Sequence, residues 1–282
     1  MSVAELSARL AASPYARFLG VRLEAADDDA LTLRLPYRDA LANRNRTVHG
    51  GVTASVLDVA GALLADGSAP RAGRTLDLSL RFLAPAEGED LVADARLVRR
   101  GGAITVVAVD ARTDAGVAVA TALLTRRAAD RPGPSLDRPS PSLAPADALD
   151  RPVRSGSPFT GQLGVAVSWF APGKAIGVLP FRSVLADADG RLHEGALAAL
   201  SDSVSGGASW SVHGLDPRGR ASTLGMHLCF HAEAPGGDVV GESHVVGHDD
   251  RVFQNAVTLR EQTTGATVAT GWLDYRIARA DV

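Results

Sequence analysis

The sequence of 282 residues repeats itself once, and this repeat limits the folds available to the chain. At a constant offset of 144, segments of the first half match segments of the second, and after a four-residue insertion near Asp216 to Gly219 the match continues at a new offset. The matched pairs are Leu19 with Leu163, Gly20 with Gly164, Pro36 with Pro180, His49 with His193, Asp58 with Asp202, Thr75 with Thr223 and Phe82 with Phe230. Two long copies predict a pseudo-dimer, because a solenoid needs more repeats.

Residues 128–156 separate the two copies. They contain six prolines among Ala, Ser, Asp and Arg, without a helical or strand period. Such composition is typical of an extended linker. We therefore expect two domains, at residues 1–127 and 157–282, each large enough to bury its own core.

Each copy has the same predicted plan, in the α+β class. A mostly apolar segment at 52–65 predicts a helix that the surrounding strands bury, and 196–210 is its counterpart in the second copy. The alternation of residues 75–82 predicts a strand with Leu78 on one face and Thr75 on the other. The other elements expected in the first copy are a helix at 4–12, a strand pair within 21–35, and strands at 91–98, 103–111 and 117–124.

Composition excludes several classes of protein. The net charge of −3 provides no broad basic field for nucleic acid or an anionic membrane. Cys229 is the only cysteine, so an intrachain disulfide is impossible. The first residues show neither a signal peptide nor a spanning run, and we expect a soluble cytoplasmic protein.

Each predicted central helix contains a single charged residue, Asp58 in the first copy and Asp202 in the second. A buried carboxylate is costly unless it is paired or used in function. For one copy alone, a structural aspartate bonded to backbone or serine is an adequate interpretation. Because both copies also place a histidine nine residues earlier, a functional role is favoured.

His49-Gly50-Gly51 lies directly before the first central helix. Free backbone N–H groups and the positive end of the helix dipole meet there, and glycine allows a carbonyl oxygen to come close. This arrangement suits an oxyanion hole, although the tripeptide alone is also typical of a plain turn. Asn43 adds an amide that could orient a substrate carbonyl or a water.

Together, Asn43, His49-Gly50-Gly51, Asp58 and Thr75 resemble the motif of the hotdog-fold acyl-CoA thioesterases of the phenylacetate-degradation (PaaI-like) type. The resemblance covers both halves and implies two tandem hotdog domains, each a curved antiparallel sheet wrapped around a central helix. It implies active sites between partners, where one supplies His, Gly and Asn and the other supplies the acid and the hydroxyl. An acyl-CoA or acyl-carrier thioester would be the substrate, with no cofactor, and the chains could form a homo-oligomer.

Helix geometry also favours sites shared between the halves. Gly50 and Asp58 are eight residues apart, about 12 Å along one helix, whereas a base must lie within about 3 Å of the atom it acts on. One half therefore cannot complete its own site. We expect two sites: site one combines Asn43, His49 and Gly50 with Asp202 and Thr223, and site two combines His193 and Gly195 with Asp58 and Thr75. Gly51 and Glu194 are further candidates for substrate binding.

The two sites differ in sequence. In the second copy Asp187 stands in the place of Asn43, and Glu194 stands in the place of Gly50. A carboxylate beside a developing oxyanion opposes it, so we expect site two to be weak, inactive or altered. The alternative is that the Glu194 side chain points away and only its backbone N–H matters.

The sequence therefore predicts a thioester hydrolase in which Asp202 acts as a general base on water or as a nucleophile. Gly50 N–H would bind the oxyanion, and Thr223 would place the water. A non-catalytic acyl-ligand binder and a hotdog enoyl-thioester hydratase are the alternatives. No zinc-ligand cluster or phosphate loop is visible in the sequence, so no metal or cofactor is expected.

Overall fold

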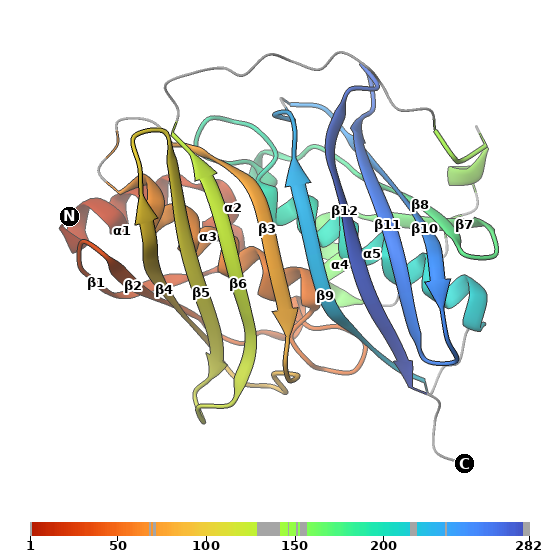
Figure 1. Ribbon diagram of the computed structural model, residues 1–282, viewed down its shortest axis with the longest axis horizontal. Helices are drawn as coiled ribbons and strands as arrows, with labels where there is room; N and C mark the ends of the chain where they lie inside the picture. Colours follow the sequence, from red (N-terminus) through yellow and green to blue (C-terminus); the bar gives the residue numbers. More distant parts are fainter. Residues whose placement is uncertain are drawn as a thin grey trace.

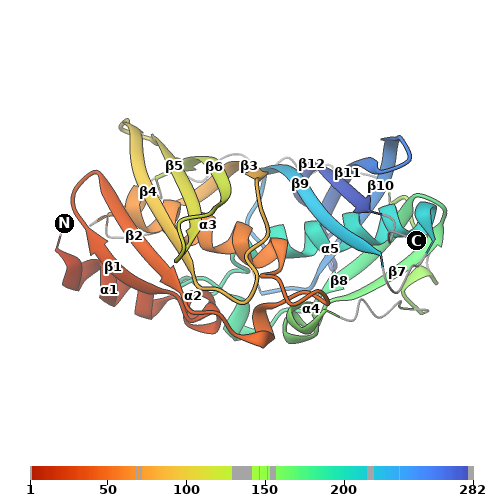
Figure 2. The same ribbon diagram turned by 90° about the horizontal axis from the view of Figure 1, so that it is seen from below.

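The structure is a computed structural model that describes residues 2–67, 69, 72–128, 142–145, 147–150, 152, 157–214, 219–234 and 236–278. In these residues one antiparallel sheet of 12 strands curves over two central helices, α3 (Gly50–Asp66) and α5 (Glu194–His213). Figures 1 and 2 show the sheet on one side and the helices on the other. Smaller helices, α1 (Val3–Ala12), α2 (Pro14–Leu19) and α4 (Pro158–Leu163), lie at the opposite side from the sheet.

The strands divide into two equivalent sets of six. The first half contributes β1 (Arg22–Ala26), β2 (Ala30–Leu35), β3 (Arg74–Phe82), β4 (Leu91–Arg100), β5 (Ile104–Thr113) and β6 (Ala118–Arg127). The second contributes β7 (Ala166–Ala171), β8 (Lys174–Leu179), β9 (Arg220–Phe230), β10 (Val239–His248), β11 (Val252–Glu261) and β12 (Thr267–Ala278). Short 3-10 turns are η1 (Asp39–Leu41), η2 (Ala148–Asp150) and η3 (Ser183–Leu185).

The strand order shows the pseudo-symmetry directly. It runs β1-β2-β4-β5-β6-β3 and then, in reverse, β9-β12-β11-β10-β8-β7. The two halves join where β3 pairs antiparallel with β9, centred on Ser79 opposite His227. This is the predicted α+β double hotdog, with the two sheets joined across a pseudo-twofold and the two central helices in contact (Figure 1).

Both central helices begin earlier than predicted. Gly50-Gly51 and Glu194-Gly195 form the first residues of α3 and α5 instead of preceding them. The reason is an N-cap that the sequence pattern did not reveal, because the ring nitrogen Nδ1 of His49 accepts the Gly51 N–H and Nδ1 of His193 accepts the Gly195 N–H. α3 is buried along nearly its whole length, including Asp58, whose exposed fraction is 0%.

The first turns of α3 and α5 pack against each other's backbone. A Cβ on Gly51 would lie 2.7 Å from both Cα and Cβ of Ala199, and a Cβ on Gly195 would lie 2.9 Å from Cα of Ser55. These distances are shorter than real Cβ contacts, so both positions require glycine. The close approach brings each helix N-terminus to the middle of the opposite helix, beneath the sheet (Figure 2).

We predict that Gly51→Ala lowers the free energy of unfolding by about 1–3 kcal/mol, because the added methyl group must push two backbones apart. Urea denaturation measures this change. The matched control is Gly161→Ala in α4, where a Cβ meets nothing within 4 Å. A Gly51→Ala protein as stable as the Gly161→Ala protein would show that the helix contact can relax.

The predicted faces of residues 75–82 are wrong at the start of β3. Thr75 is buried on the same face as Leu78, because Leu76 forms a bulge: Thr75 pairs with Arg126, and Asp77 already pairs with Thr125. The bulge recurs in β9. There Thr223 pairs with Tyr275, while Gly225 pairs with Asp274. The bulges turn the two threonines inward to the helices.

Part of the segment between the halves, residues 142–145 and 147–150, is described in the structure. It contains η2, and the Leu143 N–H donates to the Glu242 carboxylate of β10 at 2.6 Å. The rest of the predicted linker, at 129–141, 146, 151 and 153–156, lies outside the described residues, as does most of the insertion near Asp216 to Gly219. Among the helices of the described chain, none combines the length and apolar character needed to cross a membrane.

Candidate active site

Site one forms where Asp202 of α5 meets the first turn of α3. Its Oδ2 accepts the Gly51 N–H at 3.1 Å and lies 3.3 Å from Nδ1 of His49. Its Oδ1 accepts the Thr223 hydroxyl at the inner face of β9. The Asp202 side chain is only 6% exposed. The structure thus brings the acid and the hydroxyl of the second half to the His-Gly-Gly segment of the first half.

Gly50 lies directly against this carboxylate and carries a free donor. A Cβ at Gly50 would lie 3.0 Å from Asp202 Oδ2 and 3.4 Å from Thr223 Oγ1. Because Gly50 is the first residue of α3, its N–H has no intrahelical partner, and no hydrogen bond within the described residues uses it. A carbonyl oxygen could therefore be bound directly beside the carboxylate.

His49 holds the first turn of α3 as a neutral ring. Burial lowers the pKa of His49, while the nearby Asp202 carboxylate opposes this shift more weakly. A neutral ring leaves Nδ1 free to accept the Gly51 N–H at 3.0 Å. The ring packs on Phe159 of α4, with 5.3 Å between ring centroids. His49 therefore orients the loop that presents the free Gly50 N–H.

We predict that stability decreases as the pH falls from about 7 to about 5, partly through His49. Its folded pKa lies below its ordinary value of 6.5, so the unfolded chain binds the proton first and acid favours unfolding. His49→Asn keeps a capping side chain without this titration and should show a smaller decrease. Urea midpoints across this pH range measure it, with the exposed His248→Asn as control; equal slopes in wild type and His49→Asn would contradict the assignment.

Asn43 contacts its own loop. Its Oδ1 accepts the backbone N–H groups of Asn45 and Thr47, and its Nδ2 donates to Thr47 Oγ1 at 2.6 Å. No hydrogen bond in the described structure joins it to Asp202. In the second half Asp187 closes the corresponding loop through Asp189 and Arg191.

Site two repeats the arrangement with a different outcome. Thr75 donates to Asp58 Oδ1 at 2.6 Å, and His193 Nδ1 lies 3.5 Å from Asp58 Oδ2. The Gly195 N–H, however, hydrogen-bonds only His193, and Asp58 Oδ2 has no hydrogen-bond partner in the described structure. Site two therefore contains the expected residues but lacks the backbone contact that holds Asp202.

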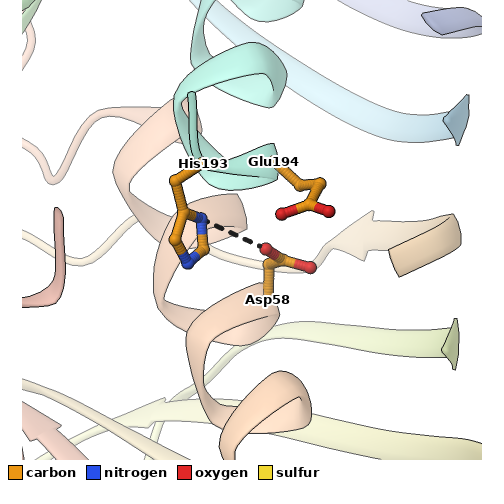
Figure 3. Close-up of side chains that lie close together, drawn as sticks. All are labelled: Asp58, His193 and Glu194. Carbon is orange, nitrogen blue, oxygen red and sulfur yellow. Dashed lines mark ion pairs between the residues drawn. The ribbon is translucent and has the colours of Figure 1, made fainter. Parts of the chain in front are cut away.

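The Glu194 side chain points toward Asp58 (Figure 3), so the alternative in which it turns away is not what the structure shows. Burial and then the Asp58 charge raise the pKa of Glu194 to about 7, whereas Arg126 and the hydrogen bond from its own backbone N–H lower it. That N–H corresponds to the free N–H of Gly50. In site two a carboxylate therefore stands at the helix start where site one has only glycine.

The sequence analysis missed the residues that lie beside Asp58 and Asp202 at the ends of α3 and α5 and on strands β6 and β12. Beside site two, buried Arg126 donates to Thr75 at 2.7 Å and pairs with Asp66 at 3.1 Å. The positions equivalent to Asp66 and Arg126 beside site one are Trp210 and Tyr275. The Arg44 guanidinium lies over the Trp210 ring, 4.8 Å from its centroid. The repeat offset relates Trp210 to Asp66 in the sequence alone. The strand register was needed to show that Tyr275 is the counterpart of Arg126.

The sequence of the chain matches one family of known proteins. The model of the family described as "Thioesterase superfamily" matches residues 45–120. A provisionally assigned esterase of Halobacterium salinarum is 39% identical over 108 residues, covering 36% of this chain and 71% of that protein. The medium/long-chain acyl-CoA thioesterase YigI of Escherichia coli is 30% identical over 129 residues, covering 40% of this chain and 83% of YigI. The chain belongs to the thioesterase superfamily.

Solved structures resemble this thioesterase-superfamily chain over nearly its whole length, and this resemblance concerns the fold alone. A protein with a hot dog fold from Alicyclobacillus acidocaldarius covers 100% of both chains with a TM-score of 0.67 at 19% identity. The acyl-CoA thioesterase II TesB2 of Mycobacterium marinum covers 92% of this chain and 97% of its own, with a TM-score of 0.66 at 17% identity. The double-hotdog fold is therefore shared with these proteins.

Proposed function

We propose that the protein hydrolyses acyl-CoA thioesters at site one. The observation that carries this proposal is the placement of Asp202 directly below Gly50, whose N–H is free. A thioester carbonyl that binds this N–H would have its carbon close to the carboxylate. Membership of the thioesterase superfamily and the likeness to YigI support the reaction class.

In the proposed reaction the Gly50 N–H and the helix dipole stabilise the oxyanion. Asp202 takes a proton from a water that attacks the carbonyl carbon, and Thr223 helps to hold that water. The tetrahedral intermediate then expels the thiolate, which recovers the proton, and a carboxylic acid is released. The alternative is direct attack by Asp202 to form a mixed anhydride that water cleaves. Single-turnover hydrolysis in ¹⁸O water tests the anhydride route, since ¹⁸O enters Asp202 only when water attacks the Asp202 carbonyl carbon of such an anhydride.

The roles of the other predicted residues follow from their contacts. His49 and Gly51 orient Asp202, and Asn43 holds the 43–47 loop, which carries Arg44 to Trp210. Burial raises the pKa of Tyr275, so its neutral hydroxyl and the Trp210 ring offer an aromatic wall beside site one. We propose that this wall contacts the substrate and that domains 1–127 and 157–282 supply complementary parts of the site. That whole chains associate into a homo-oligomer stays a prediction, which analytical ultracentrifugation would test.

The test is an assay of thiol release over a panel of straight-chain, branched and aromatic acyl-CoAs, with an acyl-carrier-protein thioester included. The proposal expects turnover of at least one acyl-CoA. Saturable acyl-CoA binding without thiol release would favour the non-catalytic binder. Loss of the double bond of an enoyl-CoA without thiol release would favour the hydratase.

A further inference from the structure

Site two gathers two carboxylates and an imidazole that the proposed hydrolysis does not use. One ligand atom from each of Asp58, His193 and Glu194 lies within 4.8 Å of the others. Within the described residues this is the only group of three such side chains that close together. Figure 3 shows the three side chains turned toward a common centre, from the end of one helix and the middle of the other.

The Asp58 oxygen that faces this centre has no hydrogen-bond partner. The Asp58 side chain is 0% exposed, and its Oδ2 receives no hydrogen bond in the described structure. The mirror oxygen, Asp202 Oδ2, accepts the Gly51 N–H. A buried carboxylate oxygen without a donor is costly, so a ligand that brings positive charge would satisfy it.

The surrounding charges point in the same direction. The carboxylates of Asp58, Glu194 and Asp66 surround one guanidinium, that of Arg126, which already pairs with Asp66 and donates to Thr75. With the carboxylates ionised, two negative charges remain. The equivalent positions of site one, Gly50, Trp210 and Tyr275, carry no charge where site two has Glu194, Asp66 and Arg126. The excess charge is therefore specific to site two.

We propose that Asp58, Glu194 and His193 bind a divalent cation in site two. A mixed set of carboxylate oxygens and an imidazole nitrogen suits Mn²⁺ or Zn²⁺. The carboxylates are the first ligands, because the lone pair of His193 Nδ1 already accepts the Gly195 N–H at 3.0 Å. His193 joins the ion by releasing that bond. A small pocket lined by Glu194, Arg191 and Phe230 among others reaches the Glu194 end of this site. This binding is independent of hydrolysis at site one.

The test measures binding of Mn²⁺ alone and Zn²⁺ alone to chelator-treated, metal-free protein by isothermal titration calorimetry. Electron paramagnetic resonance of free Mn²⁺ provides an independent count. We expect one ion per chain. At a hundredfold excess over Kd, the melting temperature should rise by about 5 °C, since an ion that binds only the folded state stabilises it.

Three variants and one matched control locate the ion. Asp58→Asn and Glu194→Gln are nearly isosteric and should weaken binding at least about tenfold, and Glu194→Gly recreates the residue found at position 50 and should abolish it. Asp202→Asn, the same change in the mirror helix, should bind the ion as wild type does. Circular dichroism confirms that each variant is folded.

Absence of saturable binding in the wild type, or binding that Asp58→Asn and Glu194→Gln leave unchanged, would overturn the proposal. A second result would also overturn it. If no variant alters Mn²⁺ or Zn²⁺ binding and metal-free Glu194→Gln melts well above metal-free wild type, then the Asp58 and Glu194 carboxyl groups share a proton instead of an ion. Equal weakening by Asp202→Asn would place the ion elsewhere and contradict the assignment to site two.

Discussion

Replacing Asp202 with asparagine should reduce thiol release by at least about 100-fold, the usual contribution of a positioned general base. Asparagine keeps the shape of the side chain. Its amide oxygen can still accept the Gly51 N–H and its NH2 group can donate to the Thr223 hydroxyl oxygen, so the fold should survive. What it loses is the negative charge that takes the proton or attacks the carbonyl carbon. Steady-state kinetics on the best substrate of the panel measures the effect.

The pattern of the loss matters as much as its size. The decrease should appear in kcat, with KM changed little, because the Gly50 N–H and the proposed Trp210 and Tyr275 wall remain. A folded Asp202→Asn protein with undiminished kcat would move the chemistry away from site one.

Asp58→Asn, the same change in the mirror site, should cost at least about tenfold less activity than Asp202→Asn. In site two Glu194 replaces the glycine of site one, and its carboxylate stands close to where a thioester oxygen would gain charge. Loss of one oxyanion donor alone costs about 10²–10³ in rate. Site two should therefore add little to total hydrolysis.

Both variants should be assayed side by side in metal-free and Mn²⁺-loaded form, after their unfolding midpoints confirm that they are folded. The metal-free comparison isolates hydrolysis from any effect of an ion at Asp58. Equal losses in the two variants would contradict the inequality. A greater loss in Asp58→Asn would reverse it and place the working site beside His193.

The repeat made much of this architecture predictable. Asp58 and Asp202 occupy equivalent helices, and each lies too far from the histidine segment of its own half, so the sequence alone predicts the pairing of the halves. The strand count and the buried central helices followed from hydrophobic patterns that extend over many residues. A pattern that extends over many residues still predicts the element when a few positions depart from it.

Local backbone features were not predictable in the same way. The bulge at Leu76 turns Thr75 inward, but it leaves the alternation of polar and apolar residues in the sequence intact. Alternation alone therefore put Thr75 on the wrong face. The His49 cap moved the helix start by two residues, because a histidine N-cap is not among the usual capping signals. Arg126 is 51 residues from Thr75 and became visible as its neighbour only through strand pairing.

The junction of β3 with β9 has an evolutionary consequence. In a homodimer every substitution appears in both active sites, so a glutamate at the first helix residue would alter both at once. Here the partners are parts of one polypeptide, and position 194 carries glutamate while position 50 keeps glycine. Because both halves belong to one chain, the two sites can carry different residues at this position. The second half stays necessary even though its own site differs, because it supplies Asp202 and Thr223 to site one and joins the first half through β3 and β9.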